Sequence, residues 1–174
     1  MEWTGARYAD RPTVEARTRI EAPPRRVWEL VSDIHLMPRL SAELQSVHWL
    51  DEVTAPALGA RFTGRSRHES LGEWETTSYV VEYEEDHTFA WAVADPQLPS
   101  AVWRFTLEAA NTGTELTQWM QMGPGRSGLS FAIDRMPDKE QKIVFVRLRE
   151  FERSMAGTVD AIKKLAESTE GTGA

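Results

Sequence analysis

The stretch IEAPPRRVWELVSDIHLMPRL, residues 20–40, leaves a strand through two prolines and enters a helix. Proline has φ preset for the first helical turn, so the double proline suits a helix start. Apolar residues then recur at helical spacing at Val27, Val31 and Ile34. Because Pro38 cannot continue that helix, the pattern predicts a break and then a second short helix over 40–44, capped by Ser41.

The segment before the prolines alternates between apolar and charged residues. Its inward set is Val14, Ala16, Thr18 and Ile20. A period of two with one charged side predicts a strand that exposes one face to water, and such strands belong to antiparallel sheets.

After residue 43 the chain repeats strand-like segments separated by short turn signals. We predict strands at 44–53, 60–70, 73–84, 88–93, 101–109 and 115–122. Consecutive strands joined by short turns form an antiparallel meander. Together with the first strand they predict a sheet of six or seven strands.

The chain ends in a segment with an apolar stripe at helical spacing. The stripe consists of Val144, Leu148, Phe151, Met155, Val159 and Ile162. It predicts one helix over 138–166, and because it lasts only about three heptads, burial against a sheet is favoured over a coiled coil. The segment 123–137 is rich in glycine and proline and predicts an irregular crossing that packs on something.

Length, net charge and cysteine content limit the number of domains, the partners and the compartment that we expect for this chain. The chain has 174 residues, no cysteine and a formal net charge of −7. We expect a single domain over 1–174, with an arm at 1–11 that docks loosely or frays and a disordered tail at 168–174. The acidic balance argues against nucleic acid, and no apolar run approaches the roughly 20 residues of a membrane span. Residues 1–16 carry no signal-peptide pattern, and the lack of cysteine fits a reducing compartment, so we expect a cytoplasmic protein.

The order of elements resembles the START-like helix-grip (SRPBCC) superfamily, and within it the bacterial polyketide cyclase/dehydrase-like group. The resemblance rests on residues 20–40, on LGARFTGRSRHESLGEWETTSYVVEYEEDHTFAW, on WRFTLEAANTGTELT and on AGTVDAIKKLAE. It implies an α+β helix-grip fold, with a six- or seven-stranded antiparallel sheet curled around a long C-terminal helix and two short helices after the first strand. It also implies a deep apolar cavity between sheet and helix, with Leu36, Met37, Pro38 and Leu40 near its mouth.

Strand alternation selects the residues expected to face that cavity. Phe62, Ser66, Trp74 and Ser78 share one side if their hairpin has a register of even parity. A one-residue slip would present Tyr79 and Val81 instead, and a bulge would use both sets in turn. From the later strands we add four candidates: Trp91, Trp103, Gln118 and Met120.

Two features of these candidates allow two interpretations each. The seven tryptophans are either core packing or the walls of a site for a flat apolar ligand. Gln118 shares its face with Leu116, Met120 and Met122, and a lone amide there needs a hydrogen-bonding neighbour or a ligand.

No catalytic signature is visible. His68, Tyr79 and Arg104 are candidate proton-transfer groups, and none is preferred. The four histidines show no zinc spacing, so we expect no metal and no cofactor. Arg61, Arg65 and Arg67 share one strand face, either as cross-strand partners of Glu73 and Glu75 or as a handle for an anionic ligand group.

The sequence therefore predicts a binder of a small hydrophobic molecule that is aromatic, polyketide-like or lipid-like. The alternative is an aromatase, cyclase or dehydrase that acts in the same cavity. A protein-interaction module ranks third, and a homodimer remains open.

Overall fold

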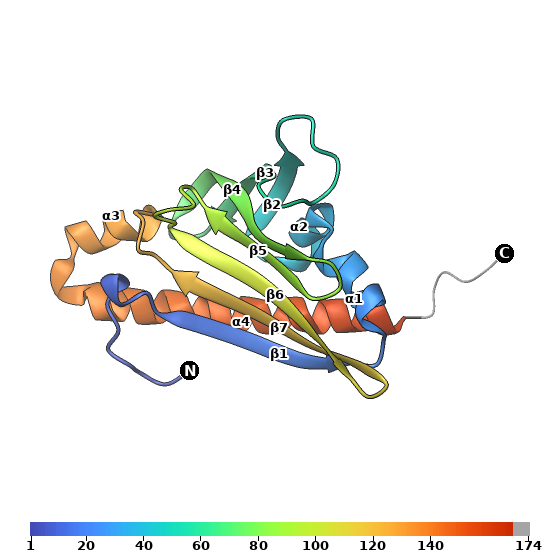
Figure 1. Cartoon of the computed structure of the whole chain (residues 1–174). Helices are drawn as coiled ribbons and strands as arrows, with labels where there is room; N and C mark the ends of the chain where they lie inside the picture. The colour runs from blue at the N-terminus through green and yellow to red at the C-terminus, as the bar shows by residue number, and fades with distance from the viewer. Residues whose placement is uncertain (169–174) are drawn as a thin grey trace.

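The computed structural model describes residues 1–168 and contains one seven-stranded antiparallel sheet with a long helix across its face (Figure 1). The expected tail falls mostly on residues 169–174, which lie outside the described residues. The strands are β1 (Thr13–Ile20), β2 (Leu44–Trp49), β3 (Arg61–His68), β4 (Gly72–Glu84), β5 (Thr88–Val93), β6 (Ala101–Ala110) and β7 (Gly113–Met122).

The strands lie in the order β1-β7-β6-β5-β4-β3-β2, so β1 and β2 form the two edges of the sheet. Strands β2 to β7 are a meander of hairpins, as their alternation and turn signals predict. The chain passes from one edge to the other through α1 (Pro24–Val31), a short 3-10 turn η2 (Ile34–Leu36) and α2 (Met37–Leu40). This connection covers one end of the sheet, at the C-terminal half of α4 (Glu140–Glu167).

The second short helix begins earlier than the sequence pattern indicated. Pro38 lies in the first turn of α2, where its missing N–H is no loss, so this proline starts a helix instead of ending one. The predicted helix over 40–44 is wrong, because β2 already begins at Leu44. The Ser41 hydroxyl accepts hydrogen bonds from the backbone N–H groups of Glu43 and Leu44 and shapes the turn into β2.

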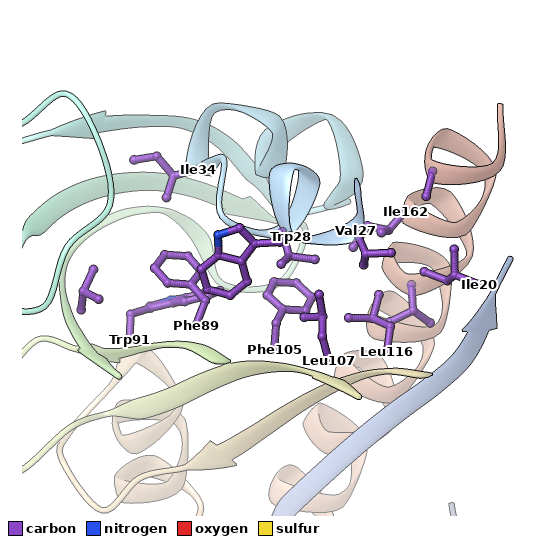
Figure 2. Close-up of a cluster of buried hydrophobic side chains, with 14 of the residues drawn as sticks. Ile20, Val27, Trp28, Ile34, Phe89, Trp91, Phe105, Leu107, Leu116 and Ile162 are labelled. Atoms are coloured by element: carbon purple, nitrogen blue, oxygen red, sulfur yellow. The ribbon is translucent and has the colours of Figure 1, made fainter. Parts of the chain in front are cut away.

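Helix α4 lies against the sheet with its predicted apolar stripe inward. Val144, Leu148, Met155, Val159 and Ile162 are each at most 3% exposed. Towards the end of α4, Ile162 packs in a cluster with Ile20, Val27 and Leu116 (Figure 2). The same cluster extends to Trp28, Phe89 and Trp91, so its side chains pack between α1, the sheet and the end of α4.

Strand β4 changes the face that it presents part of the way along. Its pairing with β3 has even parity, with Phe62 opposite Ser78 and Ser66 opposite Trp74. A bulge between Val80 and Glu82 then shifts its register with β5. Beyond this bulge Tyr83 points inward and contacts Trp28 edge to face, at 5.5 Å between ring centroids. The bulge thus changes the parity of the inward residues along one strand, but the inward residue beyond it is Tyr83 and not the expected Val81.

The segment 123–137 is less irregular than its glycines and prolines suggested. It contains a helix, α3 (Gly128–Arg135), whose start is fixed by reciprocal hydrogen bonds between Ser127 and Ser130. Leu129 faces inward, which fulfils the expectation that this segment packs on something. A 3-10 turn, η3 (Pro137–Lys139), then leads into α4.

The N-terminal arm is held by specific contacts. It includes the short 3-10 turn η1 (Tyr8–Asp10). The Tyr8 hydroxyl donates to the carbonyl of Gly125 at 2.6 Å and lies 3.1 Å from Ser127 Oγ. Arg7 pairs with Glu140 at 3.0 Å. The arm therefore ties the β7–α3 connection to the start of α4. Within residues 1–168, no helix has the length and apolar character needed to cross a bilayer.

Candidate functional site

A cavity of about 910 Å³ lies between the inner face of the sheet and α4. Most of its wall is apolar or aromatic, because inward side chains of six strands, β2 to β7, face the helix stripe across it. Aromatic contacts link the wall: Phe62 and Trp91 have ring centroids 6.0 Å apart, and Trp103 meets Phe151 edge to face at 5.3 Å. The volume lies in the range of about 300–1,000 Å³ typical of small-molecule sites.

The structure brings nine of the eleven predicted residues together around this cavity. They are Leu40, Phe62, Ser66, Trp74, Ser78, Trp91, Trp103, Gln118 and Met120. Leu36 and Pro38 do not border it, since the turns of η2 and α2 direct Met37 and Leu40 inward instead. Ligand contact by the nine remains a prediction.

The exposed part of the cavity wall lies around α3. Phe131 is 63% exposed, and the Arg126 guanidinium lies 5.4 Å from the centroid of its ring. Gly128 and Ala94 are also exposed parts of the wall. Glu75 on β4 is a further exposed wall residue. Helix α3 lies at the end of α4 away from α1 (Figure 1). Of the residues expected at the rim, Met37 and Leu40 are half-buried and border the cavity, and their place at its mouth remains a prediction.

Gln118 places a carboxamide on the cavity wall. It is 7% exposed, and its Oε1 atom is buried with no hydrogen-bond partner. Of the two interpretations of Gln118, a hydrogen bond to a neighbouring residue is therefore wrong for its Oε1 atom.

A buried charge network forms another part of the wall. The Arg147 guanidinium donates to both carboxylate oxygens of Glu43, at 2.6 and 2.8 Å, and to Glu150 at 2.8 Å. It also lies 4.2 Å from the centroid of the Phe151 ring. Burial lowers the pKa of Arg147, but the hydrogen bonds and charges of Glu43 and then Glu150 outweigh it and hold that pKa above its ordinary value. Arg147 is therefore a fixed cation neutralised by two anions.

His68 extends this network but does not line the cavity. Its Nε2 lies 3.3 Å from Glu150 Oε2, and its Nδ1 accepts from the Ser70 N–H. Ligand atoms of Glu43, His68 and Glu150 lie within 4.8 Å of one another, a grouping seen in metal sites. Here Arg147 donates to both carboxylates, so an internal cation already satisfies them.

Sequence reasoning missed this network because its members come from three distant segments. One signal was available: Arg147 lies three residues after Val144 and four before Phe151, inside the apolar stripe of α4. A charged residue in a buried stripe requires a partner.

The other two proton-transfer candidates lie beside charged residues, and only Arg104 is absent from the cavity wall. Arg104 forms a two-point pair with Glu82, at 2.7 and 2.9 Å, and its guanidinium lies 4.7 Å from the Trp119 ring. Tyr79 borders the cavity, but its ring lies 5.9 Å from the Arg61 guanidinium.

The basic strand face forms ion pairs. Arg61 pairs with Asp51 and Arg65 lies 3.6 Å from Glu73, so surface ion pairing explains these two charges. The hydrogen bond from Arg61 lowers the pKa of the Asp51 carboxyl group below its ordinary value.

This fold and cavity define a helix-grip protein of the SRPBCC type. A family model described as "Polyketide cyclase / dehydrase and lipid transport" matches residues 11–166. The match covers most of the chain, and the protein belongs to this family. Membership supports a ligand-binding or cyclase role. No curated protein matches the chain.

Solved structures agree with the family. A Polyketide_cyc-like protein from Corynebacterium glutamicum is 32% identical, with a TM-score of 0.62 over 89% of this chain and 91% of that one. A Mesorhizobium loti protein is 21% identical, with a TM-score of 0.59 over 92% of this chain and all of that one. The di-domain ARO/CYC StfQ from the steffimycin biosynthetic pathway is 12% identical, with a TM-score of 0.69 over 89% of this chain and 50% of StfQ. The last two similarities concern the fold alone.

Proposed function

We propose that the protein binds a small hydrophobic molecule, aromatic or polyketide-like, in the cavity between the sheet and α4. The observation that carries this proposal is the cavity of about 910 Å³ with Trp74, Trp91 and Trp103 in its wall. Burial of apolar ligand surface contributes roughly 25 cal/mol per Å², and flat rings add favourable geometry against tryptophan. Membership of the polyketide cyclase/dehydrase and lipid transport family supports a small-molecule ligand of this kind.

The test is titration with Nile red, an uncharged dye whose fluorescence rises in an apolar environment. We expect one dye bound per chain. Trp103→Ala should weaken binding about tenfold, the equivalent of about 1.4 kcal/mol, because it removes a ring in contact with both Phe151 and the cavity. Trp3→Ala is the matched control, since Trp3 is 55% exposed on the N-terminal arm. Equal weakening by both substitutions, or no saturable binding, contradicts the proposal.

The second candidate function is cyclisation, dehydration or aromatisation of a ligand in the same cavity. The observation that favours it is the Glu43 carboxylate, which borders the cavity while Arg147 fixes its position. A fixed carboxylate beside a folded poly-ketone could move a proton between its carbons, and such positioned groups contribute about 10²–10⁴-fold in rate.

A short poly-β-ketone thioester tests catalysis directly. We expect ring-closed product to form faster with protein than in buffer, and Glu43→Gln to lower kcat about a hundredfold. Thermal melting of the variant separates lost chemistry from lost folding. Product formation at the buffer rate with saturating protein would leave binding as the function.

A further inference from the structure

The polar groups of the cavity wall restrict the chemistry of its ligand beyond hydrophobicity. This reasoning rests on the proposed binding function. Its first element is the position of Gln118 on β7, an interior strand paired with β1 and β6. The residues opposite it are Ala16 and Phe105, and its neighbours along the inner face are Leu116 and Met120. None of these side chains can donate a hydrogen bond.

The Oε1 atom of Gln118 thus receives no hydrogen bond from its neighbours on the sheet. An amide group buried without a partner costs free energy, and a ligand that supplies the missing bond recovers it. The carboxamide can turn about its last bond to present either its oxygen or its NH₂ group. A hydroxyl group matches it best, because a hydroxyl both donates and accepts.

The second element is the charge of the wall. Its arginines are Arg126 and Arg147. Arg147 is neutralised by Glu43 and Glu150, and Arg126 pairs with Asp134. Each guanidinium already has a carboxylate partner within the protein, so an anionic ligand group would lose hydration and would have to compete with that partner for a counter-charge.

We propose that the ligand is an uncharged, largely aromatic molecule with a hydroxyl group that pairs with the carboxamide of Gln118. The apolar wall residues of the cavity contact its ring system. Free carboxylic acids, such as fatty acids, are selected against. Gln118 thereby acts as a specificity-determining residue.

The test compares three probes that share one fluorescent ring system: pyrene, 1-hydroxypyrene and 1-pyrenecarboxylate. At pH 7 the second is a neutral phenol and the third an anion. We expect 1-hydroxypyrene to bind about fivefold more tightly than pyrene, the gain of a single net hydrogen bond, and the carboxylate to bind more weakly than both.

Gln118→Leu should abolish the preference for 1-hydroxypyrene while leaving the affinity for pyrene unchanged or higher. Thr117→Val is the matched control, because Thr117 is the adjacent residue on β7 and faces the other side of the sheet. Thermal melting verifies that both variants are folded.

Each other outcome has a distinct meaning. Equal affinity for pyrene and 1-hydroxypyrene in the native protein, or tightest binding of the carboxylate, overturns the inference while the binding function stands. A preference for 1-hydroxypyrene that survives in Gln118→Leu overturns the role of Gln118. Failure of all three probes to bind overturns the binding function, and the inference with it.

Discussion

Replacement of Arg147 by methionine should destabilise the protein strongly. The guanidinium side chain is 8% exposed and makes three charge-assisted hydrogen bonds of 2.6–2.8 Å to Glu43 and Glu150. Without it, two carboxylates face one another beside an apolar cavity. Removal of one partner from a buried ion pair costs about 3–5 kcal/mol. Because Glu43 and Glu150 retain 22% and 37% exposure, water screens part of the repulsion, and we expect the lower end, about 3 kcal/mol.

The assay is urea denaturation followed by tryptophan fluorescence, together with thermal melting. For a chain of this length, a loss of about 3 kcal/mol lowers Tm by roughly 6–12 °C. The control is Arg149→Met, an exposed arginine on the same helix, which should change stability by less than about 0.5 kcal/mol. A triple variant that also carries Glu43→Gln and Glu150→Gln should recover part of the loss, because no buried charge is left unpaired.

Two results would refute this reasoning. A loss below about 1 kcal/mol in Arg147→Met would place the network among weak surface ion pairs. A triple variant less stable than Arg147→Met would show that packing of the arginine side chain, and not charge neutralisation, dominates.

Two further predictions concern the junction of β1 with β7 and α4. A Cβ atom on Gly113 would lie 2.2 Å from the carbonyl oxygen of Ile20. Gly113→Ala should therefore lower the free energy of unfolding by about 2–3 kcal/mol, measured by urea denaturation. An unchanged urea midpoint would show that the β6–β7 turn can move to relieve this contact. The Glu21 backbone N–H, followed by Lys163, lowers the pKa of Glu167 below its ordinary 4.5. A depressed carboxyl pKa contributes stability above pH 4.5 that is lost as pH falls through the folded-state pKa, so Glu167→Gln should melt below the native protein at pH 7 and converge with it at low pH. A difference that persists at pH 2 would assign the effect to something other than ionisation.

Most of the fold could be predicted because its signals are local. Strand alternation and the α4 stripe depend on residues two to four positions apart, and these patterns located seven strands and the long helix. Features decided by particular hydrogen bonds were not predictable in the same way. Pro38 is compatible with either the end or the start of a helix, and α3 forms in a glycine-rich segment because Ser127 and Ser130 cap each other.

The same distinction between local patterns and three-dimensional contacts applies to the candidate site. Its wall on the sheet followed from alternation together with the register of β3 and β4, since Trp74 and Ser78 face inward only at even parity. The exposed wall residues around α3 could not be predicted, because the glycine- and proline-rich segment 123–137 predicts an irregular crossing instead of a helix. The network around Arg147 depends on three-dimensional proximity of Glu43, His68 and Glu150, which no sequence spacing encodes.

The position of β1 at the sheet edge has a consequence for folding kinetics. Strands β2 to β7 pair with their sequence neighbours, whereas β1 pairs Val14 with Met120, on the far side of the meander in sequence. Contacts between distant segments carry a larger loop-closure cost, so we expect the hairpins to form first and β1 and α4 to dock last. The cavity is complete only after that docking. A ligand of the proposed kind, which can bind only the completed cavity, should therefore slow unfolding of the protein and leave its folding rate nearly unchanged.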